Sequence, residues 1–171
     1  MNSNELKALQ APLKSQYVDS PEAAIVSLNA TGAVNIDDLT CHVESAPSPD
    51  GRTVSGLHPA AGGDGRAACS GDMLLQSLVA CSGVTFAAVS TAMGMQISSA
   101  TVTAHGTMDF RGTLGVDRDV PIGLTSVDLS FAVESSEPDE KIEKLIQLTE
   151  RYCVVLQTLK NSVTVSSRRG E

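Results

Sequence analysis

A stretch without one charged side chain, from Met73 to Met108, constrains the fold of this chain more than any other feature. Such a segment must be covered by packed protein or by a membrane. Its first part predicts one long helix, with Asp72 as N-cap, an end near Met93 and Gly94 as terminator. Gln, Ser and Thr side chains interrupt its apolar run and no basic residues flank it, so we expect a buried helix rather than a membrane span.

A helix that is apolar nearly all round needs cover on every side, and we therefore expect a homodimer that encloses it. The 171 residues fit one domain, which would bury roughly 70% of the surface of the unfolded chain. We expect an N-terminal helical appendage over residues 1–21 and a single domain over residues 22–171. Residues 4–20 are predicted as a short amphipathic helix, interrupted at Pro12, and then a polar connector that ends at Pro21.

Alternation of apolar and polar residues predicts the strands of an α+β fold. The first two would form a hairpin, and the fourth and fifth would pair antiparallel with one wet face. A second helix is expected from Pro138, with Cys153 and Leu156 on its core-facing stripe. The strands are expected over residues 26–36, 39–43, 53–57, 102–110, 127–133 and 162–166.

Charge and composition exclude several classes of partner. The net charge is −8 and the only basic cluster is Arg168-Arg169, so neither nucleic acid nor an anionic membrane is expected as a partner. Residues 1–10 lack the pattern of a secretory signal, so we expect a cytoplasmic protein whose thiols stay reduced. There is no Cys-x-x-Cys and the three histidines are scattered, so no metal site and no cofactor are predicted.

Thiols are the groups in this sequence that can carry out two-electron redox chemistry unaided, and Cys81 and Cys153 each lie in a helical pattern. Composition alone favours Cys81 as a small buried hydrophobe, because free cysteine is among the most buried residue types. Reactivity needs a thiolate, which burial disfavours. Cys81 lies about 13 Å along the helix from Asp72, beyond the reach of the helix dipole, so a cation from elsewhere would be needed.

Three sequence features together resemble the osmotically inducible protein C / organic hydroperoxide resistance family. These are Gly71-Asp72-Met-Leu-Leu-Gln-Ser-Leu-Val-Ala-Cys81, the paired strands after it, and Leu148-Thr-Glu-Arg-Tyr-Cys153. The resemblance covers roughly residues 26–166. It implies an OsmC-like α+β fold, with antiparallel curved sheets around a long buried central helix. It also implies an intertwined homodimer with sites at the subunit interface.

The resemblance further implies a cysteine-based thiol peroxidase for small apolar organic hydroperoxides, with hydrogen peroxide as a further substrate. Cys81 would be peroxidatic and would become a sulfenic acid. Cys153 would resolve it to a disulfide, which a dithiol reductant, lipoyl-type dithiols included, would reopen. Cys69, in the loop before the long helix, is either an alternative resolving cysteine or structural, while Cys41 is expected in the core.

The sequence departs from the family pattern at the activating groups. In the organic hydroperoxide branch an Arg of the N-terminal hairpin, held by a Glu near the helix start, activates the thiolate. Residues 26–44 contain no Arg, and Asp72 matches the acidic position only approximately. Arg111 is the first substitute cation and Arg66 the second, although each is individually better explained as a surface arginine. His105 alternates outward and is assigned no catalytic role. The alternative is a small-molecule binding or stress-response protein with structural cysteines.

Overall fold

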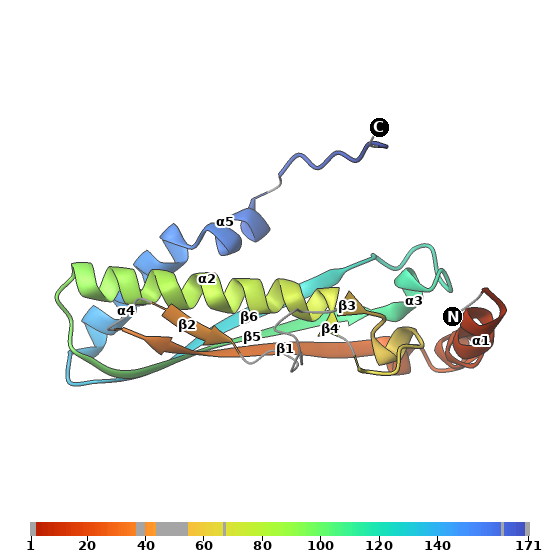
Figure 1. The fold of residues 1–171 in the computed structure, drawn as a ribbon, viewed down its shortest axis with the longest axis horizontal. Helices are drawn as coiled ribbons and strands as arrows, with labels where there is room; N and C mark the ends of the chain where they lie inside the picture. Colours follow the sequence, from red (N-terminus) through yellow and green to blue (C-terminus); the bar gives the residue numbers. More distant parts are fainter. Residues whose placement is uncertain (1–2, 37–39, 44–54, 67, 162, 170–171) are drawn as a thin grey trace.

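The computed structural model describes residues 3–36, 40–43, 55–66, 68–161 and 163–169, and a four-stranded antiparallel sheet forms its base (Figure 1). The strand order is β2-β1-β5-β6. A separate two-stranded parallel sheet joins β3 to β4. The six strands are β1 (Ile25–Asn35), β2 (Thr40–Val43), β3 (Ser55–Gly56), β4 (Ala68–Cys69), β5 (Ile97–Asp109) and β6 (Leu124–Ser135).

Both predicted strand pairs are confirmed. β1 and β2 form the N-terminal hairpin, and residues 37–39 between them lie outside the described residues. β5 and β6 pair antiparallel, and alternation gives β5 one buried and one exposed face, with Val102 and Ala104 buried and His105 exposed. Alternation therefore predicted this sheet well, because one of its faces is covered and the other is open.

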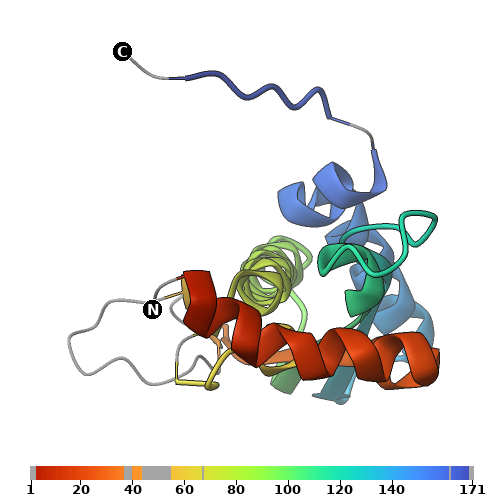
Figure 2. The same ribbon diagram turned by 90° about the vertical axis from the view of Figure 1, so that its right-hand side faces the viewer.

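Two strand predictions need correction. In the described part of the predicted third strand, Ser55–Gly56 form β3 and Leu57 does not continue it, and its partner β4 was not predicted. The final strand is absent over the described residues 163–169, which are exposed and project away from the rest of the chain (Figures 1 and 2). The alternation of Val163 and Val165 gives this segment a local preference for an extended conformation. A strand also needs the edge of another strand to share its backbone hydrogen bonds.

The helix α2 (Ser70–Ala92) lies along one face of the large sheet (Figure 1). Strand β4 ends directly at Cys69, so Cys69 is the N-cap and Asp72 lies inside the first turn, which corrects the predicted start. Gly94 follows the helix with φ +64°, as expected of a glycine terminator. The buried residues of α2 are Leu75, Leu78, Val79, Ser82, Gly83, Phe86, Ala87 and Ser90.

In the described part of the chain, α2 is the one helix that is long and apolar enough to cross a membrane, by length and composition alone. A helix that forms a protein core passes the same test, and this one packs against β1, β2 and β5. Its cover within one chain is incomplete, since Leu74 and Val84 are 40% and 42% exposed.

The predicted second helix is broken at Cys153. It consists of α4 (Asp139–Tyr152) and α5 (Val154–Lys160), and both pack against α2. Cys153 adopts the extended angles φ −69° and ψ 107°, so it ends one helix and begins the next. The apolar stripe continues across the break at helical spacing, which is why periodicity did not reveal it.

The N-terminal helix α1 (Ser3–Asp19) continues through Pro12, contrary to the predicted interruption. A proline in a helix removes one backbone hydrogen bond, and the helix tolerates that loss here. α1 lies across one end of the molecule (Figure 2), where it contacts η1 (Pro21–Ala24), η2 (Pro59–Ala61) and α3 (Phe110–Thr113). Tyr17 fixes it there, because its side chain is 2% exposed and its hydroxyl donates to the Ala60 carbonyl at 2.7 Å.

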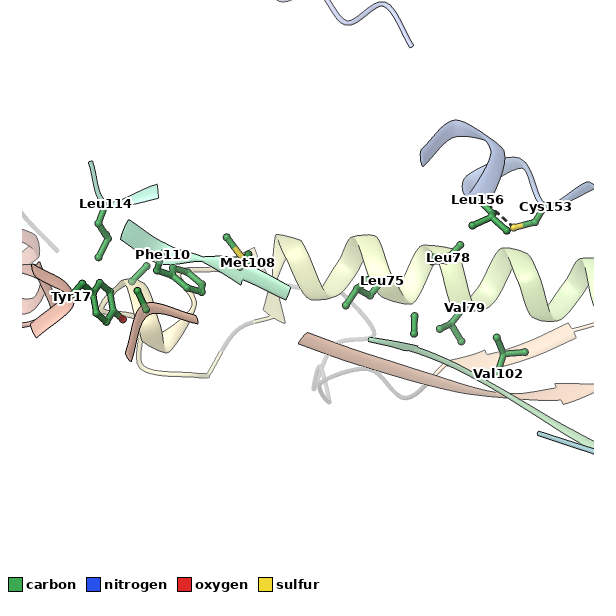
Figure 3. Packing of buried hydrophobic residues seen from close by; sticks show 13 residues of the cluster. Tyr17, Leu75, Leu78, Val79, Val102, Met108, Phe110, Leu114, Cys153 and Leu156 are labelled. Atoms are coloured by element: carbon green, nitrogen blue, oxygen red, sulfur yellow. Dashed lines mark hydrogen bonds between the residues drawn. The ribbon is translucent and has the colours of Figure 1, made fainter. Parts of the chain in front are cut away.

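The core consists of two clusters along α2. The larger cluster joins Leu75, Leu78 and Val79 of α2 to the sheet and extends to Tyr17 and Phe110 (Figure 3). The smaller one surrounds Phe86 and includes Met95, Ala100 and Leu145. Cys153 and Leu156 belong to the larger cluster, so the C-terminal helix break is part of the core.

Candidate thiol site

Cys153 is held by the helix that it begins. Its side chain is fully buried, and its sulfur accepts a hydrogen bond from the backbone N–H of Leu156 at 3.4 Å (Figure 3). This is the geometry of an N-cap, in which a side-chain acceptor satisfies an N–H of the first turn. The break between α4 and α5 therefore places a thiol at a defined point against α2.

Two consecutive residues of α2 meet this thiol. The hydroxyl oxygen of Ser82 lies 3.2 Å from the Cys153 sulfur, and both side chains are fully buried. The Cys81 thiol also interacts with the Cys153 thiol. Cys81 is only partly buried, and both cysteines are free thiols. The structure thus brings together the two cysteines that the sequence singled out.

The pKa of the Cys153 thiol is raised, chiefly because burial disfavours the thiolate. The hydrogen bonds from Ser82 and from the Leu156 N–H act in the opposite direction, and the neighbouring Cys81 raises the pKa further. Burial therefore favours the neutral form of the Cys153 thiol, which interacts with the thiol of Cys81.

Arg111 is engaged elsewhere. It lies in α3, two residues after the end of β5. Its guanidinium donates to Oδ2 of Asp109 at 2.6 Å and 3.0 Å, and to Oδ1 of the same carboxylate at 3.2 Å. Asp117 lies 3.9 Å away on its other side. The hydrogen bond from Arg111 is the main reason why the pKa of Asp109 is lowered. The neighbouring Phe110 lies at the opposite end of the core cluster from Cys153 (Figure 3).

The other predicted activating groups also lie apart from the thiol pair within one chain. Arg66 is an exposed residue whose guanidinium is 3.8 Å from Asp64. Asp72 lies in the first turn of α2, about two and a half turns before Cys81. Among the described residues, the contacts of Cys81 and Cys153 include neither an arginine nor a carboxylate.

The remaining predicted residues can be placed more briefly. Cys69 is partly buried at the start of α2. His105 is exposed and lies across from Asp128 in the sheet. The expected core position of the Cys41 side chain lies outside what the structure describes. Within the described ranges, no group of three or more His, Cys, Asp or Glu side chains could hold a metal ion.

Sequence reasoning missed Ser82 and the helix break. Ser82 directly follows Cys81 and is polar in an apolar helix, but its partner comes from a distant helix and only the fold reveals it. The break had a local signal. Val154 and Val155 are β-branched residues directly after Cys153, and such residues lose side-chain freedom in a helix.

An apolar cavity of about 400 Å³ lies between α2, β6 and α5. Its lining includes Leu74 of α2 and Leu156 of α5. Leu74 lies seven residues before Cys81, so the two share one face of the helix. A larger hollow of about 730 Å³, beside Thr91 and Gly94, lies at the C-terminal end of α2. Another cavity, of about 390 Å³, lies beside Cys69 and Phe110. The cavity of about 400 Å³ is connected to the thiol site through Leu156, whose backbone N–H donates to the Cys153 sulfur, although neither Cys81 nor Cys153 is part of its described lining.

A sequence model of the OsmC-like protein family matches residues 63–168, more than half of the chain. The chain belongs to the OsmC-like family. This confirms the resemblance that the sequence motifs indicated, and the matched segment contains both Cys81 and Cys153.

Solved structures agree with this OsmC-like fold. The chain resembles an OsmC-like hydroperoxide resistance protein from Jannaschia sp. CCS1, with a TM-score of 0.58 and 15% identity, over 86% of this chain and 95% of that one. It also matches an OsmC-like protein from Mycoplasma pneumoniae, with a TM-score of 0.48 and 19% identity, over 81% of this chain and 86% of that one. No curated protein sequence matches significantly. The likeness to the Jannaschia structure agrees with the mixed α and β fold and antiparallel sheet of this chain.

Proposed function

We propose that this OsmC-like protein is a cysteine-based thiol peroxidase that reduces organic hydroperoxides. The observation that carries the proposal is the place of the two thiols. The Cys153 sulfur lies 3.2 Å from the hydroxyl of Ser82, the residue directly after Cys81. Cys81 packs against the core cluster that contains Cys153, and the two thiols interact. Cys81 is partly accessible and Cys153 is fully buried. The accessible thiol suits the attack on a substrate, and the buried thiol suits the resolution of the product.

In the first step, the thiolate of Cys81 attacks one oxygen of the hydroperoxide and the O–O bond breaks. The alkoxide that leaves takes up a proton and departs as an alcohol, while Cys81 becomes a sulfenic acid. The cavity beside Leu74 and Leu156 supports an apolar alkyl group on the substrate, because its described lining is mostly aliphatic.

In the second step, the Cys153 thiol loses its proton and its sulfur attacks the sulfur of Cys81. The S–O bond breaks, hydroxide takes up the proton and leaves as water, and a disulfide forms. A dithiol, lipoyl-type dithiols included, then reduces the disulfide by exchange and is itself oxidised to a cyclic disulfide.

We also propose that the protein acts as a cytoplasmic homodimer. The exposed Leu74 and Val84 on α2 support this, because a second copy would complete the cover of an otherwise core-forming helix. If the subunit interface covers α2, then α2 is the central helix of an intertwined dimer. Such an interface is also the means by which Arg111 of a second copy would reach the thiol pair and favour the thiolate of Cys81. The carboxylate of Asp72 could help only by holding such a cation, because a negative charge beside a thiol disfavours its thiolate.

A second candidate function is a small-molecule binding or stress-response protein with structural cysteines. Two observations favour it. The pKa of Cys153 is raised by burial, and no arginine contacts the thiol pair among the residues described within one chain. In that case the cavity of about 400 Å³ would bind an apolar ligand, and no reaction of that ligand would be catalysed.

The test is the consumption of cumene hydroperoxide by the purified protein with dihydrolipoamide as the reductant. The Cys81→Ser variant should lose turnover, whereas Cys69→Ser, a matched change at a thiol outside the pair, should retain it. Equal turnover in wild type and Cys81→Ser would contradict the peroxidase. Absence of turnover in all three proteins would favour the binding protein.

A further inference from the structure

Ser82 is an unusual residue for the middle of a buried helix. Its hydroxyl bonds across to the Cys153 sulfur, whereas Ser90 and Thr91 of the same helix donate to the carbonyl of Ala87 one turn earlier. A buried hydroxyl without a partner is costly, so a serine here is stabilised by this one contact to another helix.

The contact forms part of a three-sided cradle around one sulfur. The Leu156 N–H donates to Cys153 from α5, the Ser82 hydroxyl contacts it from α2, and the Cys81 thiol adjoins it. An N–H group can only donate, and a hydroxyl can donate to sulfur as well. The cradle therefore offers two donors to a Cys153 thiolate when that thiolate forms.

We propose that Ser82 is a positioning residue for the resolving step, holding the Cys153 sulfur beside Cys81 and stabilising the thiolate that attacks the Cys81 sulfenic acid. This inference rests on the proposed peroxidase function and assigns a step within it. The proton released from Cys153 leaves with the hydroxide displaced from Cys81, so Ser82 neither gains nor loses a proton overall. Ser82 fixes the position of the Cys153 sulfur and stabilises the negative charge of its thiolate.

The surroundings of Cys153 leave few other groups to set its protonation. The titratable side chain that meets it from α2 is Cys81, and the nearest charged residue of α2 in sequence is Asp72, in its first turn. Strand β5, which packs against α2, carries no charged residue before Asp109. The charged residues of α4 and α5 nearest to Cys153 in sequence are partly or fully solvent-exposed: Glu150, Arg151 and Lys160.

Three variants of the full chain separate this role from simple packing. Ser82→Ala removes the hydroxyl, and Ser82→Thr retains it. Ser90→Ala is the matched control, because Ser90 is an equally buried serine of the same helix whose hydroxyl donates to its own helix backbone. Only Ser82→Ala removes a hydrogen-bond partner of Cys153.

The kinetic readout is a single turnover with one equivalent of cumene hydroperoxide between pH 5.5 and 9. Mass spectrometry follows Cys81 sulfenic acid trapped by dimedone and the Cys81–Cys153 disulfide. In Ser82→Ala, sulfenic acid should form at the wild-type rate. The disulfide should form at least about tenfold more slowly at neutral pH, which is the scale of one lost hydrogen bond to a charged group. The pH dependence of the rate of disulfide formation should shift to higher pH. Ser82→Thr should restore the rate, and Ser90→Ala should match wild type.

A second readout needs no peroxidase activity and keeps the two proposals distinguishable. With ¹³Cβ-labelled cysteine, NMR follows the titration of Cys153 in the reduced protein, with Cys153→Ser for assignment. We expect the pKa of Cys153 to be higher in Ser82→Ala than in wild type and Ser90→Ala. An unchanged titration, or an unchanged rate and pH profile of disulfide formation, would overturn the role of Ser82. Failure of wild-type Cys81 to react with the hydroperoxide would instead overturn the proposed function.

Discussion

Ser82 and Cys153 are 71 positions apart and share a buried contact of 3.2 Å between hydroxyl and thiol. The contact joins the middle of α2 to the break between α4 and α5, both of which pack against α2. Cys81 therefore lies within a helix, and Cys153 lies directly between two helices rather than on a long loop. Sites built on such elements hold their geometry more closely than sites on loops.

The first prediction concerns the division of labour between the two thiols. In Cys153→Ser, the Cys81 sulfenic acid should form but have no thiol to resolve it. We expect it to persist and to oxidise further to the sulfinic acid with excess hydroperoxide. Intact-mass measurement after dimedone trapping reports both species. Normal disulfide formation in this variant would show that another cysteine, with Cys69 the first candidate, resolves the sulfenic acid.

The second prediction concerns the docking of α1. Tyr17→Phe removes the hydroxyl that donates to Ala60 and should lower the free energy of unfolding by about 1 kcal/mol. Tyr17→Ala also leaves a cavity and should lower it by about 3 kcal/mol. Val18→Ala, at a neighbour that is 64% exposed, should change it by less than about 0.5 kcal/mol. Urea denaturation measures all three, and equal values for the three variants would contradict the docking.

The third prediction concerns pH and the pair of Asp109 and Arg111. Because the pKa of Asp109 is lowered in the folded protein, chiefly by the hydrogen bond from Arg111, its carboxylate stabilises the fold at neutral pH. That contribution is lost as the pH falls below the ordinary range of an aspartate, about pH 4. Asp109→Asn should therefore have a lower Tm than wild type at pH 7, and the gap should narrow on acidification. A difference in Tm between wild type and Asp109→Asn that does not change with pH would contradict a stabilising ion pair between Asp109 and Arg111.

Sequence reasoning reached the elements whose pattern depends on one buried face. Strands β5 and β6 alternate because the sheet is covered on one side, and α2 carries no charged residue after Asp72 because it forms the core. The OsmC-like assignment followed from the same segment. Such patterns persist in the sequence because burial acts on every residue of the face.

Features set by partners distant in sequence were not reachable in this way. The helix break at Cys153 depends on the contact of its sulfur with Ser82 and on the packing of α5 against α2. The start of α2 after Cys69 depends on the pairing of β4 with β3. Likewise, the alternation of Val163 and Val165 predicted a strand, but pairing requires a strand edge to receive it.

The direct test of the account is peptide mapping of the disulfide after one equivalent of cumene hydroperoxide reacts with the fully reduced protein. The account predicts a Cys81–Cys153 disulfide with stoichiometric release of cumyl alcohol, absent in Cys81→Ser and undiminished in Cys69→Ser. Alcohol release without that disulfide, or unchanged reduced thiols with no alcohol, would contradict the assignment of these two cysteines as a peroxidatic and resolving pair.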